Sequence, residues 1–182
     1  MAPYWSDHWG NPSSRQHRQG LTASAAVALA RRQIAEALGI DPDRLIFTSG
    51  ATEANNLALL GHARTHGGGH LISVRTEHQA VLDPLGQLQR EGFQVSLLQP
   101  QSNGLITPAQ LEEAIRPETR LVSVMAANNE IGVLQPLKEF AEICRNRGVV
   151  FHSDAAQAFG HIPLEPDNLG LDLVSLSAHK LY

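Results

Sequence analysis

The sequence predicts an α/β fold in which a mostly parallel sheet has helices on both faces. One observation is a set of short runs rich in branched apolar residues, each bounded by turn or polar residues, as strands are. There are six such runs, at residues 44–50, 70–74, 93–98, 120–125, 149–153 and 172–177. The second observation is that segments of helical length lie between most of them, at residues 52–65, 79–91, 108–116 and 137–147. Strands that alternate with helices indicate βαβ units and therefore parallel pairing.

A further helix is predicted ahead of the first run, in "TASAAVALARRQIAEALG" at residues 22–39. Its apolar residues recur at helical spacing and define one face: Val27, Ala30, Ile34 and Leu38. Gly39 is the expected stop. The preceding "GNPSSRQHRQG" is rich in Gly, Pro, Ser and Asn, which favours a loop. We therefore expect an N-terminal arm at residues 1–20 and one large domain at residues 21–182.

Composition limits the classes of protein to which the chain can belong. Its 182 residues are 42% hydrophobic and 18% charged, enough for one sizeable core. The net charge is −4 and Lys and Arg are scattered, so neither nucleic acid nor a membrane surface is an expected partner. No apolar stretch approaches the roughly 20 residues that span a bilayer. The single cysteine, Cys144, fits a reducing compartment, and we expect a cytoplasmic protein.

Polar residues follow five of the six predicted strands. In a parallel sheet, ligands bind at the carboxyl ends of the strands. The polar groups at these ends are residues 49–52, 77–78, 128–130, Asp154 with Gln157, and Ser177 with His179 and Lys180. The order of elements thus places them all along one edge of the sheet.

The stretch "TSGATEANN" has the order strand, glycine turn, helix. Gly50 allows a sharp turn, and the backbone N–H groups of Ala51 and Thr52, together with the helix dipole, favour an anion such as phosphate. Ordinary helix capping is the alternative interpretation.

Lys180 is expected at the end of a buried strand, beside Ser177 and His179. Desolvation would favour its neutral amine, which is the nucleophile that a carbonyl group requires. The alternative is a lysine that extends from the strand end into solvent.

Three more residues fit an aromatic cofactor. Asp154 could lie beneath a pyridine ring and keep its nitrogen protonated, and Gln157 could hold a phenolic oxygen. His78 could stack on such a ring or carry protons. For the first two, an Asp at a helix start followed by a helical Gln is the alternative.

A metal site would draw on the same region. Its candidate ligands are His78, His152, Asp154 and His179. We expect no metal, because we expect no close pair such as H-x-x-x-H on a helix.

Six motifs in this order and spacing resemble the first half of a cysteine desulfurase. They are "GNPSSRQH", "FTSGATEANN", "TEHQAVLD", "AANNEIGVLQP", "HSDAAQAFG" and "SAHKLY". That family consists of pyridoxal 5′-phosphate (PLP) enzymes of the class V aminotransferase group, with the aspartate-aminotransferase fold (fold type I). The resemblance begins at about Gly10 and implies the large domain of that fold, incomplete and cut after the cofactor lysine.

The resemblance implies a cofactor site for PLP. Lys180 would hold the cofactor covalently. Its phosphate would be bound by Ala51, Thr52, Ser177 and His179.

It also implies roles around the cofactor ring. Asp154 would pair with the pyridine nitrogen, and Gln157 with the phenolic oxygen. His78 would stack on the ring and move protons, and Asn129 would lie near the cofactor and the substrate carboxylate. The implied catalytic residues are Lys180, His78 and Asp154.

The implied activity is conversion of L-cysteine to L-alanine, with sulfur passed to an enzyme persulfide for iron–sulfur cluster or thio-cofactor synthesis. The implied partners are a second copy in a homodimer and a sulfur-acceptor or scaffold protein. The family's nucleophilic cysteine and its carboxylate-binding arginine lie in its second half. Cys144 in "FAEICRNRGV" is expected to face the core from a helix. We therefore expect the chain to carry the PLP site without the catalytic cysteine, and to be inactive alone. The alternatives are a selenocysteine lyase, a kynureninase-like hydrolase or another class V PLP enzyme, and a non-catalytic remnant that binds a partner.

Overall fold

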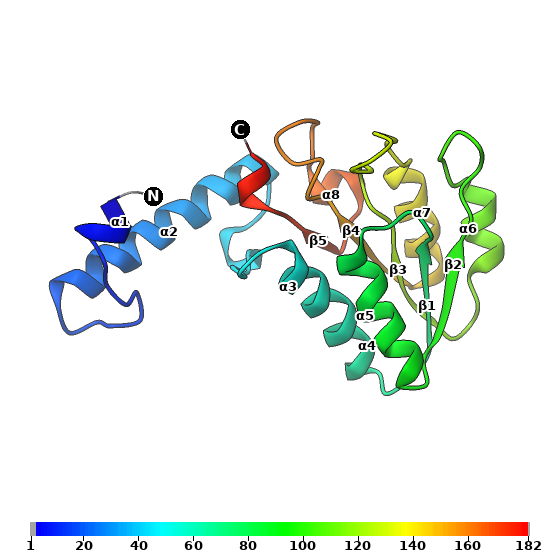
Figure 1. Cartoon of the computed structure of the whole chain (residues 1–182), viewed down its shortest axis with the longest axis horizontal. Coiled ribbons are helices and arrows are strands. Elements are labelled where there is room, and N and C mark those ends of the chain that lie inside the picture. Colours follow the sequence, from blue (N-terminus) through cyan, green and yellow to red (C-terminus); the bar gives the residue numbers. More distant parts are fainter. Residues whose placement is uncertain (1–2, 182) are drawn as a thin grey trace. The chain divides into compact units, whose positions relative to one another are not determined.

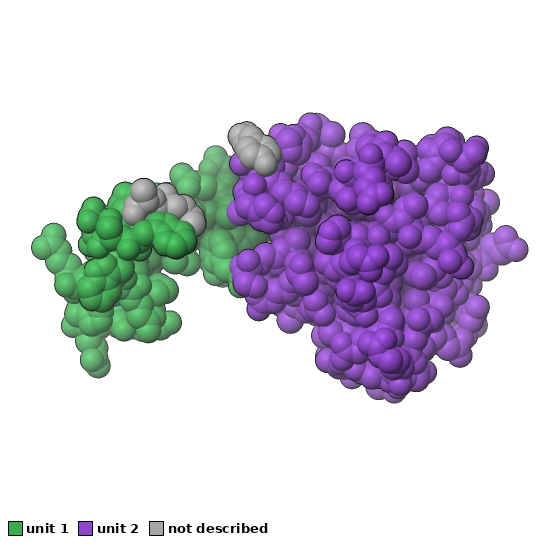
Figure 2. Space-filling model, viewed as in Figure 1, with its two compact units in different colours: residues 1–47 green, residues 48–182 purple. Residues whose placement is uncertain are grey.

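The computed structural model describes residues 3–181 and divides the chain into two compact units, Met1–Phe47 and Thr48–Tyr182 (Figures 1 and 2). The expected arm at residues 1–20 and domain at residues 21–182 stay a prediction. Parts of both, residues 1–2 and 182, lie outside the described residues.

The first unit contains helices α1 (Pro3–Ser6) and α2 (Arg18–Leu38) and the 3₁₀ turn η1 (Pro42–Arg44). Helix α2 confirms the predicted helix and begins four residues earlier. His17 caps it, because its side chain accepts a hydrogen bond from the Gly20 N–H at 3.1 Å. Gly39 ends it in the left-handed conformation, with φ of 66°.

The predicted apolar face of α2 is only partly buried. The buried residues of the helix are Gly20, Ala23, Ala35 and Leu38. Val27 is 39% exposed, and of the four predicted residues only Leu38 is buried. Within its own unit, other segments of the chain contact α2 at Gly20 and at Arg31. A Cβ on Gly20 would meet the Ser14 carbonyl oxygen, and Arg31 donates to the Leu45 carbonyl.

The second unit is built on a five-stranded sheet of order β2-β1-β3-β4-β5, parallel throughout. Its strands are β1 (His70–Val74), β2 (Gln94–Leu98), β3 (Thr119–Ser123), β4 (Val150–Asp154) and β5 (Leu173–Ser175). The predicted fold class is confirmed, as are five of the six predicted strands.

The sixth predicted strand, residues 44–50, is wrong. Residues 45–48 have no regular secondary structure and pair with none of the described strands. Ile46 and Phe47 are 69% and 46% exposed. The branched residues of this run favour extended backbone locally, but a strand also needs a neighbouring strand to pair with, and this run has none among the described strands.

Helices cover both faces of the sheet (Figure 1). On one face lie α3 (Ala51–Asn56), α4 (His62–Thr65) and α5 (Gln79–Arg90); on the other lie α6 (Pro108–Ala114), α7 (Leu137–Arg147) and α8 (Pro166–Leu169). A π-helical turn, η2 (Leu57–Gly61), joins α3 to α4. No helix among residues 3–181 combines the length and apolar character needed to cross a membrane.

The core is double-sided because successive strand residues point to opposite faces. Leu71 and Leu121 pack with Leu59 and Leu85 on the α4–α5 side. On the other side, Phe151 meets Phe140 of α7 edge to face, with ring centroids 6.4 Å apart. Burial of each such side chain contributes about 1.5–3 kcal/mol to the free energy of unfolding. Packing on both faces therefore holds the strand ends in place.

A buried imidazole links three adjacent strands. His152 of β4 is fully buried, with Nδ1 2.9 Å from the Ser123 Oγ of β3 and Nε2 3.0 Å from the Ser175 Oγ of β5. Burial lowers the pKa of His152 to about 4, so the ring is neutral at physiological pH.

Candidate active site

A pocket opens at the carboxyl ends of the strands. Strand β2 lies on one side of β1 and β3 lies on the other side, so the strand order reverses at β1. Ligand sites form where the strand order reverses in this way. The pocket has a volume of about 450 Å³ and is lined by the start of α3 and by residues that follow β1, β3, β4 and β5.

The structure brings all nine sequence-predicted site residues to this pocket: Ala51, Thr52, His78, Asn129, Asp154, Gln157, Ser177, His179 and Lys180. The lining also includes small and apolar residues that sequence reasoning missed, among them Ala80, Met125, Ala127 and Ala156. These supply space and an apolar wall, and no pattern in the sequence distinguishes them from other core residues.

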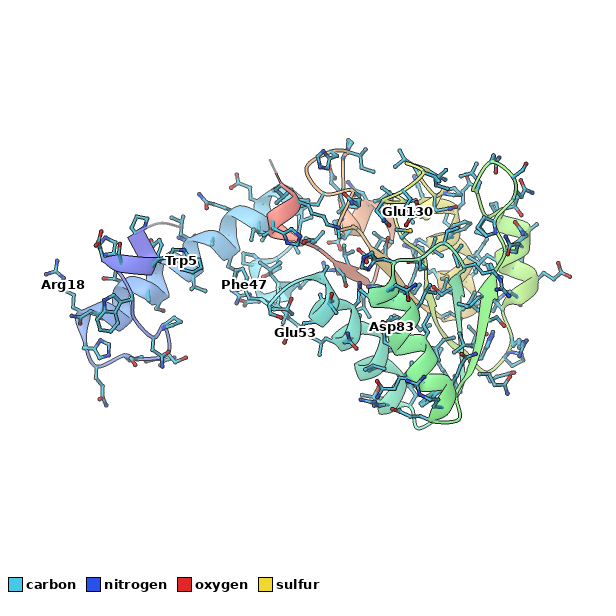
Figure 3. The ribbon with its side chains drawn as sticks, in the orientation of Figure 1. Trp5, Arg18, Phe47, Glu53, Asp83 and Glu130 are labelled. Carbon is cyan, nitrogen blue, oxygen red and sulfur yellow. The ribbon has the colours of Figure 1, made fainter. Side chains whose placement is uncertain are left out.

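The start of α3 is open to an anion. Gly50 occupies the cap position and offers no side chain, so the first helical N–H groups have no side-chain cap. The Glu53 carboxylate instead accepts the Ser49 backbone N–H at 2.6 Å, which lowers the pKa of Glu53. Glu53 is exposed and also lines the pocket (Figure 3). The open N–H groups and the helix dipole are what a phosphate requires.

Asp154 ends strand β4 with its carboxylate held on both oxygens. Oδ1 accepts the Ala156 N–H at 2.9 Å and Oδ2 accepts the side-chain amide of Asn55 at 2.8 Å. Asp154 is only 5% exposed, and Gln157 follows it in a turn rather than in the helix of the alternative interpretation. Sequence reasoning missed Asn55, whose only signal was a polar residue inside a short helix.

A second carboxyl group, that of Glu77, lies buried near Asp154. Its Oε1 accepts the Met125 N–H at 2.7 Å, and its Oε2 has no partner among the described residues. Burial is the main cause that raises the pKa of Glu77 to about 8; the hydrogen bond from Met125 lowers the pKa, and the negative charge of Asp154 contributes a smaller rise. Glu77 is therefore protonated at neutral pH.

His78 caps helix α5 and faces the pocket. Its Nδ1 accepts the Ala80 N–H at 3.0 Å, so a neutral ring carries its proton on Nε2. The loop that carries His78 is fastened to the segment after β3, because the Asn128 amide donates to the Thr76 carbonyl at 2.8 Å. This contact fixes the place of His78 relative to Asn129.

The cluster near the C-terminus lies on a turn, which corrects the expected strand end. Strand β5 stops at Ser175, and Lys180 belongs to the 3₁₀ turn η3 (Ala178–Lys180). Ser177 is buried, His179 is exposed and Lys180 is half-buried rather than enclosed. The Ser177 Oγ lies 2.9 Å from His179 Nδ1, so the two residues act as one polar unit beside Lys180.

The four candidate metal ligands do not form one cluster. His152 is enclosed by serine hydroxyls and is absent from the pocket lining. Among residues 3–181, no group of three or more His, Cys, Asp or Glu side chains could hold a metal ion. The expectation that no H-x-x-x-H pair lies on a helix is wrong: His62 and His66 flank one turn of α4, with ring centroids 4.5 Å apart. That pair precedes β1 and so lies at the opposite edge of the sheet from the pocket.

Cys144 faces the core from α7, as predicted. It is 1% exposed, and burial raises the pKa of its thiol to about 12. The thiol is therefore protonated and poorly reactive.

Comparison with known proteins places the chain in a family. The aminotransferase class-V family matches residues 1–182. Cysteine desulfurase IscS of Glaesserella parasuis is 53% identical over 176 residues, which are 96% of this chain and 43% of that protein. A probable mitochondrial cysteine desulfurase of Schizosaccharomyces pombe is 53% identical over 184 positions, which cover 100% of this chain and 37% of that protein.

Solved structures agree with the sequence comparison. The structure of SspA in complex with cysteine superposes with a TM-score of 0.95 at 41% identity, covering 98% of this chain and 52% of SspA. A NifS-like protein gives a TM-score of 0.95 at 36% identity, covering 99% of this chain and 50% of that one. The chain thus spans about half the length, or less, of the relatives it matches. On the match over its whole length and on these identities, the chain belongs to the aminotransferase class-V family.

Proposed function

We propose that the chain supplies the PLP-binding half of a cysteine desulfurase, which converts L-cysteine to L-alanine and passes the sulfur to a protein thiol. The observation that carries the proposal is the convergence, in one pocket, of an uncapped helix start, a fixed carboxylate and a lysine. The relatives named cysteine desulfurase support it.

The residues of the pocket fit PLP. Ala51 and Thr52 offer backbone N–H groups to the phosphate, and Ser177 and His179 add polar groups from the segment after β5. Lys180 supplies the amine for covalent attachment. When bound, PLP supplies an aldehyde that condenses with amino groups and a ring that withdraws electrons from the substrate.

The remaining residues orient the ring and move protons. The Asp154 carboxylate is fixed by two N–H donors, so it can hold a protonated ring nitrogen without moving. Gln157 is proposed for the phenolic oxygen. His78 presents an aromatic face and an Nε2 proton, and Asn129 an amide for the substrate carboxylate.

The thiol that receives sulfur is not among the described residues. Cys144 is the one cysteine of the chain, and it is buried and protonated. We therefore propose that the thiol, a second subunit and the sulfur-acceptor or scaffold protein for iron–sulfur cluster synthesis complete the site, and that the isolated chain is inactive. SspA, solved with cysteine, supports L-cysteine as substrate. We propose a cytoplasmic location; one relative is named as mitochondrial, and both compartments are reducing.

Covalent labelling tests the proposal. The purified chain is incubated with PLP, reduced with borohydride, digested and mapped by mass spectrometry. The label is expected on Lys180 and should be lost in Lys180→Ala. A label on Lys138, the other lysine of the chain, would refute the assignment.

A further inference from the structure

Asn55 is a buried polar side chain without contact to the pocket itself. It is 0% exposed at the next-to-last position of α3 and is not among the lining residues. Its amide nitrogen donates to Asp154 Oδ2 at 2.8 Å, across 99 residues of sequence. The side-chain hydrogen bond of Asn55 therefore connects it to the pocket through Asp154.

The position of Asn55 is energetically unfavourable for an amide side chain. Asn is a weak helix former, and its Oδ1 is buried with no partner among the described residues. An apolar residue of similar size would avoid that unpaired oxygen. The single hydrogen bond that Asn55 makes with its side chain in the described structure is the one to Asp154.

The bond fixes the direction of the Asp154 carboxylate. Ala156 holds one oxygen from the backbone, and Asn55 holds the other from a different helix. Two donors on two oxygens prevent rotation of the carboxylate. The neighbouring Glu77 has no side-chain donor on its Oε2, so the two buried carboxyl groups differ in what the chain provides for them.

We propose that Asn55 is a positioning residue that locks the Asp154 carboxylate in the orientation required by the ring nitrogen of PLP. Cofactor affinity should then depend on Asn55 only when the ligand has a ring nitrogen. The inference rests on the proposed function, because it assumes that Asp154 faces the ring of PLP.

The first test uses two ligands on the 182-residue chain. Binding of PLP and of its 1-deaza analogue, in which carbon replaces the ring nitrogen, is measured by equilibrium dialysis. Asn55→Leu should weaken PLP binding about tenfold, as expected for a lost hydrogen bond to a charged group, and leave the analogue unchanged. The matched control is Asn56→Leu, because the Asn56 amide donates to the Thr52 carbonyl at 2.7 Å. This variant should leave the ratio of the two ligand affinities as it is in the wild type.

Two further variants complete the design. Asn55→Leu added to Asp154→Ala should weaken PLP binding no more than Asp154→Ala alone, since the two residues act as a unit. Asn55→Ser, a smaller change, decides the question should Asn55→Leu not fold, as judged by circular dichroism. The inference would be overturned if the folded variant weakened binding of both ligands equally. It would also be overturned if the variant weakened binding of neither ligand while Asp154→Ala weakened binding of PLP.

A cofactor-free readout separates this inference from the proposed function. In the unliganded chain, the side-chain amide protons of Asn55 should exchange with solvent slowly by NMR. Asp154→Ala should accelerate that exchange at least about tenfold, because the acceptor is lost. Unchanged exchange in Asp154→Ala would contradict the inference, whereas accelerated exchange in a chain that binds neither ligand would contradict the proposed function alone.

Discussion

Replacing Glu77 by glutamine should change how the stability of the second unit depends on pH. The pKa of Glu77 is raised from 4.5 to about 8 in the folded chain. Between these two values the folded state binds the Glu77 proton and the unfolded state does not. The contribution of Glu77 to stability is therefore fully present below pH 4.5 and is lost as pH rises toward 8, by about 1.4 kcal/mol per pH unit.

His152 acts in the opposite direction. Its pKa is lowered from 6.5 to about 4, so between these values the unfolded state binds the additional proton. Its contribution is present above pH 6.5 and is lost as pH falls toward 4, again by about 1.4 kcal/mol per pH unit. From pH 6.5 down to 4.5 the two slopes have opposite signs and cancel. Other titrating groups are common to all variants and cancel in the comparison.

Urea unfolding followed by circular dichroism at pH 7.0, 6.0 and 5.0 measures these slopes. Glu77→Gln keeps an acceptor for the Met125 N–H and removes the titration. It should be more stable than the wild type at pH 7 by about 3 kcal/mol, from 2.5 pH units between 4.5 and 7. Between pH 6 and 5 this advantage should shrink by about 1.4 kcal/mol. His152→Gln should instead gain stability relative to the wild type over the same interval.

The matched control is Glu113→Gln, at an exposed position of α6, which should follow the wild-type curve. A Glu77→Gln curve that runs parallel to the wild type at all three pH values would refute the reasoning, because it would show that Glu77 does not take up a proton on folding.

Three further predictions concern other parts of the chain. The Cys144 thiol should react with a disulfide dye only as fast as the chain unfolds, because its pKa is raised to about 12; rapid reaction in buffer without urea would contradict its burial. Gly148 ends α7 in the left-handed conformation, with φ of 65°, so Gly148→Ala should lower the free energy of unfolding by about 1 kcal/mol in the same urea assay. Gly86→Ala, inside α5, should leave the free energy of unfolding unchanged or raise it. The isolated chain with PLP and L-cysteine should produce no sustained sulfide; sulfide with stoichiometric alanine that is lost in Cys144→Ser would show that Cys144 is the nucleophile.

Most of the sheet could be predicted because alternation of apolar runs with helical segments leaves few arrangements. The exception, residues 44–50, has a strand composition, but pairing depends on a neighbouring strand that no local pattern specifies. The sequence likewise predicts a strand that runs to Ser177 and ends beside Lys180, since "LVSLS" continues the alternation past Ser175, where β5 stops.

The site could be predicted in outline for a topological reason. Parallel strands end at one edge, so polar residues that follow them converge whatever their separation in sequence. The supporting contacts could not, because each joins residues far apart along the chain. Asn55 reaches Asp154 across 99 residues and Glu77 reaches Met125 across 48, and neither pairing leaves a pattern within a sequence window.

The π-helical turn η2 sets the rotational phase of the helix that contains Asn55. Asn55, Leu59 and Ala63 are all buried and recur every four residues, a spacing that drifts by about 40° per step in a regular α-helix. The wider turn at Leu57–Gly61 rotates the chain less per residue and offsets that drift, so one amide can reach Asp154 while two apolar residues enter the core. Deleting Ala58 would restore a regular helix and turn α3 by about 100° relative to α4, carrying Asn55 away from Asp154. A single-residue deletion would therefore yield a more regular helix and remove one of the two donors that hold Asp154, so at this turn the length of the chain matters to the pocket.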